Sequence, residues 1–393
     1  MRRSLLSLTL SVLAPAFLCF LPIELARAQT ETVLHSFGGQ AGDGLYPSAG
    51  LALDKSGNVY GTTNQGGAQG LYGTGAVFEV TSGGAEEVLY SFNYQIDGGS
   101  SNAGLIFDKK GNLYGTTGGG GSGGFGSVFE LTSQNTEKVL YSFRGGPDGG
   151  ESSGNLVRDA KGNLYGTTYW GGTQNYGVVF KLTSKGVETP LHSFTGPPAD
   201  GYYPTAGLAL DNEGNLYGTT PFGGANGYGT VFEVTSDGSE KLLYSFGNYP
   251  GDAIGPEGGL ILHNKGTLYG TTSAGGANNL GTVFELTPDG TEKILYSFGS
   301  HAGDGYDPET GNLVFDKKGN LYGETVRGGA TGCGTVFELT RKGIEKVFYS
   351  FGAQLEDGCY PQGGVVLDAE GNVYGTTFEG GTWGVGTVFK VVP

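Results

Sequence analysis

Charged side chains that interrupt a glycine-rich sequence are the first candidates for chemistry. Glu324 and Arg327 place a carboxylate and a guanidinium three residues apart, which is either a binding pair or a surface ion pair worth little energy. Arg158 and His263 offer another cation and a proton-transfer group. Spacing assembles no Ser–His–Asp set, carboxylate pair or His-rich metal cluster from a chain with 4 His. We therefore assign no catalytic residue, no metal ligand and no cofactor.

Aromatic side chains occur in the same segments, which are rich in Gly and Asn. Their faces can stack on sugar rings, because a large flat side chain with a polar neighbour suits such a ligand. Asn and Asp beside them can bond hydroxyl groups. Together with Glu324 and Arg327, the predicted binding residues are Tyr169, Trp170, Phe222, Phe378 and Trp383.

An Asp recurs in one long connecting segment of the sequence. Carboxylates suit Ca²⁺, so these residues could form a ring of cation sites. Asp-Gly also makes tight turns, with the carboxylate bonding local backbone amides, and no segment has the dense Asp/Asn alternation of a calcium loop. We favour the turn interpretation for all copies: Asp43, Asp97, Asp148, Asp200, Asp252, Asp304 and Asp357.

Two of the 3 cysteines, Cys333 and Cys359, lie in two successive long segments. If the chain is exported, its compartment is oxidising and favours a disulfide between them. Two free thiols or a metal pair are the alternatives, and neither has a nearby His to support it. We predict a disulfide between Cys333 and Cys359.

These candidates belong to a unit that recurs about every 52 residues. Its signature, GNVYGTT at 57–63, returns with small changes at 111–117, 162–168, 214–220, 266–272, 319–325 and 371–377. The Gly inside each YGTT is expected where a neighbouring backbone approaches closely. His35 and His192 stand where other copies have Tyr, and we expect them to pack as Tyr does.

Each unit has four strand-like pieces separated by turn residues, and helical periodicity is absent. The 79 Gly, 23 Tyr and 22 Phe fit many turns and strands. Repeats of this length with four strands are typical of a β-propeller. The chain opens on a fourth-strand sequence, ETVLHSF at 31–37, and ends on a third, GTVFKVV at 386–392. We predict an all-β, seven-bladed β-propeller closed by pairing of the N-terminal strand with the last blade, with an open solenoid as the alternative.

The unit YGTTxxGGxxxxGTVFELT…EKVLYSF resembles the tandem repeat of bacterial GloVer-type "choice-of-anchor" proteins, over nearly the whole chain. A shorter portion, GLxLDxxGNLY, is similar to the blade start of NHL-type propellers. The GloVer resemblance implies an exported, surface-associated repeat protein and supplies no catalytic residues. Members often carry a C-terminal anchoring tail; this sequence stops after its last strand, so we expect a released protein.

Residues 1–28 have the features of a signal peptide. Arg2 and Arg3 precede an apolar run, and Ala26-Arg27-Ala28 offers a cleavage site. A retained membrane anchor is the alternative. We expect cleavage near Ala28, a single propeller domain over 29–393, and a secreted, periplasmic or cell-surface location without a remaining transmembrane segment. The net charge of −16 argues against nucleic acid as a partner, and a monomer is expected.

Two hypotheses of function follow. The first is a non-catalytic binding propeller whose long loops recognise a carbohydrate or a cell-surface protein, with repeated pockets adding avidity. The second is an enzyme of lactonase, lyase or glycosidase type that uses the central pocket. It rests on fold analogy alone, and its candidate residues are Glu324, Arg327, Arg158 and His263.

Overall fold

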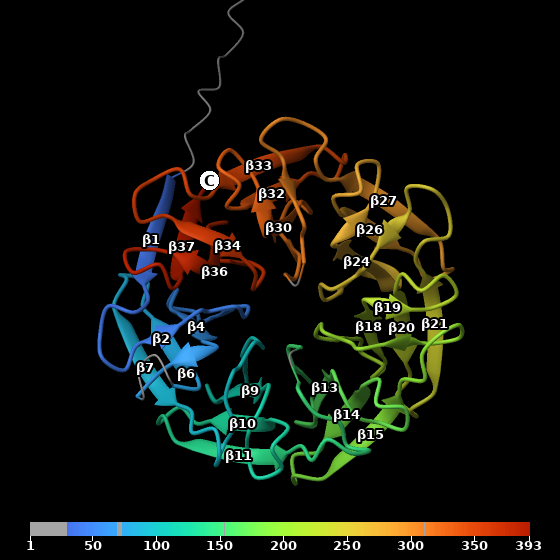
Figure 1. Cartoon of the computed structure of the whole chain (residues 1–393), viewed down its shortest axis with the longest axis horizontal. Coiled ribbons are helices and arrows are strands. Elements are labelled where there is room, and N and C mark those ends of the chain that lie inside the picture. Colours follow the sequence, from blue (N-terminus) through green and yellow to red (C-terminus); the bar gives the residue numbers. More distant parts are fainter. Residues whose placement is uncertain (1–29, 69–72, 153, 310) are drawn as a thin grey trace, which may run out of the picture.

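The computed structural model describes residues 30–68, 73–152, 154–309 and 311–393. The predicted signal peptide lies outside these residues. Seven antiparallel sheets of four strands each surround a common axis, so the fold is a seven-bladed β-propeller, as predicted (Figure 1). Within the described residues the one helical segment is a short 3₁₀ turn, η2 (Asn264–Gly266).

The four strands of each blade follow one another in sequence and in space, except at the closure. The first strands are β3 (Ala52–Leu53), β8 (Ile106–Phe107), β12 (Val157–Arg158), β17 (Ala209–Leu210), β23 (Ile261–His263), β29 (Val314–Phe315) and β35 (Val366–Leu367). The second strands are β4 (Val59–Thr62), β9 (Leu113–Thr117), β13 (Leu164–Thr168), β18 (Leu216–Thr220), β24 (Thr267–Thr272), β30 (Leu321–Thr325) and β36 (Val373–Gly380).

The third and fourth strands form the outer half of each blade, and Figure 1 shows the fourth strands along the rim. The third strands are β6 (Ala76–Val80), β10 (Ser127–Leu131), β14 (Val178–Leu182), β20 (Thr230–Val234), β26 (Thr282–Leu286), β32 (Thr335–Leu339) and β37 (Thr387–Val392). The fourth strands are β7 (Glu86–Ser91), β11 (Glu137–Ser142), β15 (Glu188–Ser193), β21 (Glu240–Ser245), β27 (Glu292–Ser297), β33 (Glu345–Ser350) and β1 (Thr30–Ser36).

The ring closes through the two ends of the chain. β1 pairs antiparallel with β37, from Thr30 opposite Val392 to Ser36 opposite Thr387. β1 is therefore the fourth strand of the seventh blade, which otherwise consists of β35, β36 and β37. This pairing confirms the closure predicted from the sequence, and it gives both terminal strands a partner.

The glycine inside each YGTT makes room for an aromatic ring of its own blade. A Cβ on Gly166 would lie 2.8 Å from Cζ of Phe180 and 3.0 Å from a methyl group of Leu156. The expectation that a neighbouring backbone approaches here is therefore wrong. Phe180 is fully buried, as are its counterparts in the other blades, and only a residue without a side chain lets the ring reach the second strand.

Neighbouring blades share their hydrophobic cores and a hydrogen bond near the axis. One cluster joins Tyr114 and Phe143 of the second blade to Leu156 and Phe180 of the third. The first Thr of YGTT donates its hydroxyl to a carbonyl in the loop leading to the next blade at Thr62, Thr116, Thr167, Thr219 and Thr376, for example from Thr167 to Ala206 at 3.0 Å. The apolar surface and these bonds hold the blades in register, which fixes the loops at the ends of the strands.

Candidate functional site

The two long loops of each blade lie together on one face. Short ribbons join the loop after the fourth strand to the loop after the second. These pairs are β2 (Gly44–Leu45) with β5 (Gln65–Gly66), β16 (Gly201–Tyr202) with β19 (Phe222–Gly223), β22 (Ala253–Ile254) with β25 (Ala274–Gly275), β28 (Gly305–Tyr306) with β31 (Arg327–Gly328), and β34 (Gly358–Pro361) with β36. We call this surface the long-loop face.

A polar hollow of about 370 Å³ opens at the axis on this face. Its polar lining consists of hydroxyl and amide side chains, and Phe378 contributes one aromatic ring. Several of these groups bond one another across blades: Ser48 donates to Asn102 Oδ1 at 2.8 Å, and Asn64 Nδ2 donates to the same oxygen at 2.8 Å. The hollow therefore presents neutral hydrogen-bonding groups held in place by their neighbours.

Two positions in each loop place side chains at the hollow or near it, and Ser48, Asn102, Thr205 and Gln362 are among the residues that line it. We call these two positions the rim position, three residues after the recurring Asp, and the channel position, five residues after it. The channel position carries Ser48, Asn102, Thr205, Glu257, Glu309 and Gln362 in the described copies. The rim position carries Tyr46, Ser100, Glu151, Tyr203, Gly255, Asp307 and Tyr360, all in left-handed backbone with φ between 52° and 66°.

Left-handed backbone is costly for every residue except glycine, by about 1–3 kcal/mol. Only Gly255 avoids this cost at the rim position. The other six side chains differ widely, and four meet a residue near the end of the second strand: Tyr46 meets Phe378, Glu151 and Tyr203 meet Trp170, and Asp307 meets Arg327. Strain kept at a variable, outward-facing position is typical of a binding site.

An aromatic cluster covers the rim of the third and fourth blades. Tyr169 and Tyr203 stack with ring centroids 4.8 Å apart, and Trp170 packs edge-on against both. Tyr202 stacks on Phe222 at 5.4 Å. We define the aromatic cluster as Tyr169, Trp170, Tyr176, Tyr202, Tyr203 and Phe222. Trp170 donates from Nε1 to Glu151 at 2.8 Å, which fixes the indole.

The predicted aromatic residues are thus only partly brought together. Tyr169, Trp170 and Phe222 join the aromatic cluster, whereas Phe378 lies by the hollow against Tyr46 at 5.1 Å. Trp383 is 60% exposed and packs over Gly38 and Gly39 near the closure. The sequence analysis missed Tyr202 and Tyr203, although the YYP segment stood out among the copies of that loop.

A carboxylate cluster, made of Glu257, Asp307 and Glu309, adjoins these groups in the fifth and sixth blades. Burial, then Asp307 and Glu257, raise the pKa of Glu309 to about 7. Arg327 Nε lies 3.6 Å from Asp307 Oδ2 and counters part of this charge. Burial, then Tyr203, Glu151 and Glu257, raise the pKa of Tyr169, so the charge of Glu257 acts on the aromatic cluster. Aligning the channel positions would have revealed Glu257 and Glu309.

Glu324 and Arg327 pair with different residues and not with each other. Glu324 is 5% exposed, and it takes the place of the Thr that elsewhere bonds the next blade. Its Oε1 accepts a hydrogen bond from the Gly364 N–H at 2.5 Å. Burial raises the pKa of Glu324 to about 8, although the Gly364 bond opposes the shift. The side chain therefore belongs to the wall between blades, while Arg327 is exposed and pairs with Asp307.

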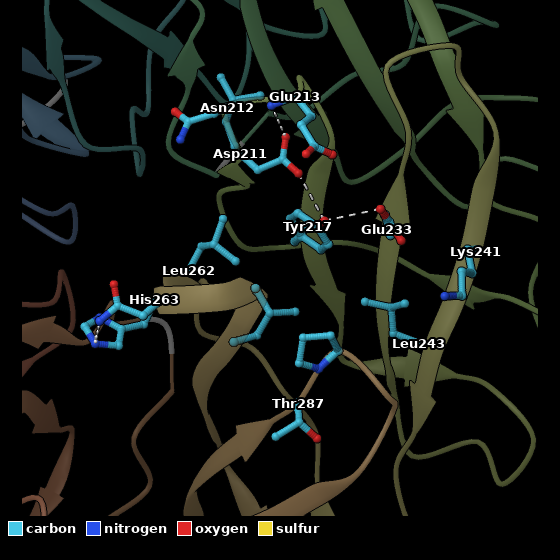
Figure 2. Close-up of a pocket in the computed structure, with 15 residues that line it drawn as sticks. Asp211, Asn212, Glu213, Tyr217, Glu233, Lys241, Leu243, Leu262, His263 and Thr287 are labelled. Carbon is cyan, nitrogen blue, oxygen red and sulfur yellow. Dashed lines mark hydrogen bonds between the residues drawn. The ribbon is translucent and has the colours of Figure 1, made fainter.

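His263 and Arg158 belong to the opposite end of the blades, where the short turns lie. His263 lines a groove of about 680 Å³ between the fourth and fifth blades, with the turn residues Asp211 and Thr287 (Figure 2). Arg158 lies over the Tyr114 ring at 5.5 Å. The enzyme hypothesis needed Glu324, Arg327, Arg158 and His263 in one pocket. The structure instead places Glu324 in the wall between blades, Arg327 on the long-loop face, and Arg158 and His263 at the opposite end.

Each recurring Asp accepts a hydrogen bond from a backbone N–H group of its own loop. Asp148 accepts from the Arg144 N–H at 3.0 Å and from the Tyr141 hydroxyl at 2.9 Å. Asp252 accepts from the Asn248 N–H at 2.7 Å in the same manner. His192 replaces the Tyr of this arrangement and bonds Asp200 at 3.0 Å. These contacts are those expected from the turn interpretation.

A disulfide joins Cys333 to Cys359, with their Cα atoms 4.6 Å apart. Cys333 follows β31 in the sixth blade, and Cys359 belongs to β34 in the loop that leads into the seventh. The bond therefore fastens two long loops of neighbouring blades on the long-loop face. It closes a segment of 26 residues.

The fold and this face define a β-propeller with one strongly asymmetric loop surface. A family model of the Gloeobacter/Verrucomicrobia repeat matches residues 23–159, 135–314 and 209–393. The chain therefore belongs to the Gloeobacter/Verrucomicrobia repeat family, which confirms the GloVer resemblance. No curated protein matches it.

The solved structures similar to the chain include two extracellular domains of bacterial proteins. Two are extracellular domains of proteins described as hybrid two-component systems from B. thetaiotaomicron. One has a TM-score of 0.60 at 10% identity over 92% of this chain, the other 0.58 at 15% over 93%. The chain spans 39% and 41% of their lengths. This likeness shows the fold. Among the described residues, no helix has the length and apolar character to cross a membrane.

Proposed function

We propose that the protein is an exported, non-catalytic propeller that binds a neutral carbohydrate on its long-loop face. The observation that carries the proposal is the aromatic cluster beside a hollow lined by hydroxyl and amide groups. Sugar rings have apolar faces and many hydroxyls, so a ligand of this class uses both features at once. The extracellular domains among the structural neighbours and the Cys333–Cys359 disulfide support an extracellular location.

The stacking surface is built to stay rigid before a ligand arrives. Tyr203 packs against Tyr169, Trp170 and Tyr202, so little side-chain entropy remains to be lost on binding. Phe222 is 43% exposed and offers a free ring face at the edge of the cluster. Rigid, half-buried aromatic residues of this kind are the usual centres of binding energy.

Charge argues for a neutral ligand. The chain has a net charge of −16, and Glu257 of the carboxylate cluster is one of the groups that raise the pKa of Tyr169. An acidic polysaccharide would meet repulsion there, whereas the carboxylates accept hydrogen bonds from hydroxyls. Arg327 is engaged with Asp307 and offsets only one of these charges.

The carboxylate cluster also supports a second candidate function, a propeller enzyme acting on a glycosidic bond. Glu309, with its pKa raised to about 7 by burial and by the neighbouring carboxyl groups of Asp307 and Glu257, has the character of a general acid. Measuring the release of reducing ends from the bound polysaccharide, with Glu309→Gln as the control, separates the two functions. The binding proposal expects none from either protein.

A glycan array and calorimetry with soluble neutral polysaccharides test the proposal. Trp170→Ala should weaken binding about 10- to 30-fold, the effect of losing one central aromatic contact. Tyr228→Ala is the matched control, because Tyr228 is 49% exposed and lies outside the aromatic cluster. Failure of the wild-type protein to bind any neutral glycan, or equal binding by Trp170→Ala, would overturn the proposal.

A further inference from the structure

Each seam between neighbouring blades brings together the side chains of an Asp and a Glu. The Asp caps the loop after one fourth strand, and the Glu begins the fourth strand of the next blade. In three seams a His joins them, so that nitrogen and carboxylate oxygens lie within 4.8 Å of one another. These seam clusters are His35–Asp43–Glu86, His192–Asp200–Glu240 and His301–Asp304–Glu345.

In the first seam cluster each of the three residues has one buried polar atom without a hydrogen-bond partner. His35 Nε2, Asp43 Oδ1 and Glu86 Oε1 are buried atoms with no hydrogen-bond partner among the described residues. The Asp43 side chain is 1% exposed, and His35 Nε2 lies 3.5 Å from its other oxygen. That oxygen is held by the N–H groups of Gly38 and Gly39. A buried polar atom left unsatisfied is costly, and each of the three residues contributes one.

In the second seam cluster the equivalent His and Asp have hydrogen-bond partners. His192 Nε2 lies 3.0 Å from Asp200 Oδ2, and Asp200 Oδ1 accepts from the Gly201 N–H at 2.7 Å. Only Glu240 keeps an unpartnered oxygen there. In the third cluster His301 is exposed and bonds Glu345 at 2.9 Å, while Asp304 Oδ1 and Glu345 Oε1 are buried without a partner. Among the three seam clusters of the described residues, the first is therefore the one in which the His nitrogen is unpartnered as well.

We propose that His35, Asp43 and Glu86 bind one divalent transition-metal ion, with Zn²⁺ as the best fit. Imidazole nitrogen and carboxylate oxygen are both zinc ligands, and three protein ligands leave the fourth tetrahedral position to a water, as in zinc sites that keep an open position. Ca²⁺ and Mg²⁺ prefer all-oxygen sites with more ligands. The two negative carboxylates also balance the double positive charge of the ion, and the neutral imidazole adds no charge.

The position of the site gives it a structural role. His35 lies on β1, the strand that closes the seventh blade, and Glu86 lies on β7 of the first. Asp43 belongs to the loop that connects these blades. His35 is further held by Phe37, with ring centroids 4.8 Å apart. A metal ion at this seam would fasten the closing strand to the neighbouring blade.

Titration calorimetry with ZnCl₂ tests the site, using the full chain without a histidine tag after removal of metals by a chelator. The wild type should bind one Zn²⁺ per chain, show no comparable binding of Ca²⁺ or Mg²⁺, and melt at a higher temperature with zinc. His35→Tyr should lose this binding at least tenfold. It should still fold, because Tyr occupies the equivalent position beside Asp in five other blades.

His192→Tyr is the matched control, since it makes the same replacement in the hydrogen-bonded seam cluster. Glu86→Gln removes one charge with little change of shape and should also weaken zinc binding. The proposal is overturned if the metal-free wild type binds no stoichiometric zinc, or binds Ca²⁺ as well as zinc. Equal zinc affinity in wild type and His35→Tyr, or a loss confined to His192→Tyr, contradicts it as well.

Discussion

Glu137 at the start of β11 faces Asp97 in the loop that follows β7, so carboxyl groups of adjacent blades meet at the seam. Burial, and then the charge of Asp97, raise the pKa of Glu137 to about 7. Asp97 also accepts hydrogen bonds from the Tyr90 hydroxyl and the Asn93 N–H. The same pairing recurs at Glu31, Glu188 and Glu292, whose pKa values are likewise raised to about 7.

We expect the protein to be more stable at pH 5 than at pH 8. A glutamate whose folded pKa lies above its unfolded value near 4.5 stabilises the fold below that value. This contribution is lost as pH rises through about 7. Thermal unfolding measured across this range, with a chelator present, should show a falling melting temperature. The double variant Glu137→Gln, Glu188→Gln should flatten the slope, and a melting temperature that rises toward pH 8 would contradict the account.

Below about pH 4 we expect stability to fall as the pH falls, because a second group of carboxylates has lowered pKa values. Burial acts to raise the pKa of Asp108, but hydrogen bonds from Asn112 and Lys110 outweigh it and lower the pKa. The equivalent turn residues Asp159, Asp211 and Asp368 behave alike. Their stabilisation is present above the unfolded pKa and is lost as pH falls through the lower folded value. The two effects together place the stability maximum near pH 5.

Gly166→Ala should destabilise the protein by about 1–3 kcal/mol, the usual cost of overpacking a core. The added Cβ would lie 2.8 Å from Cζ of Phe180, a ring with no space to move into. Gly83→Ala is the control, because a Cβ there has its nearest neighbour at 3.9 Å in an exposed turn. Chemical denaturation of the two variants checks the difference. Equal stability of Gly166→Ala and Gly83→Ala would mean that Gly166 is not needed to make space for the Phe180 ring.

Replacing both Cys333 and Cys359 by Ser should lower the free energy of unfolding by about 2–4 kcal/mol. The disulfide closes a 26-residue segment, and its removal frees the unfolded chain. Denaturation with and without a reductant measures the effect, and the double variant should no longer respond to the reductant. Glycan binding should persist, because the aromatic cluster lies in other blades. A double variant as stable as the oxidised wild type would contradict this prediction.

The sequence predicts the fold well because the information is repeated. Every copy of YGTT predicts the second strand of a blade, and every copy of GTVFELT predicts the third, so an ambiguous copy can be interpreted from the others. The unmatched strands at the two ends of the chain predict the closure. Packing partners were harder to predict. The strand glycine faces a ring of its own blade, since sequence shows that space is needed but not which neighbour fills it.

The site was predicted in part. Tyr169, Trp170 and Phe222 were found as departures from the repeat, and they do lie in the aromatic cluster. Glu324 was found in the same way, but it replaces a buried Thr and lies between two blades. Glu257 and Glu309 were missed because carboxylates 52 residues apart look unrelated until the ring brings their blades together. The function of a side chain here depends on which end of its strand it occupies.

Tryptophan fluorescence tests the central claim most directly. The chain has 2 Trp, one in the aromatic cluster and one near the closure. In Trp383→Phe, Trp170 is the remaining reporter, and titration with the bound neutral polysaccharide should change its emission with the affinity found by calorimetry. Trp170→Phe should show no such change from Trp383. If the ligand binds while Trp170 stays silent and Trp383 responds, carbohydrate recognition by the aromatic cluster is contradicted.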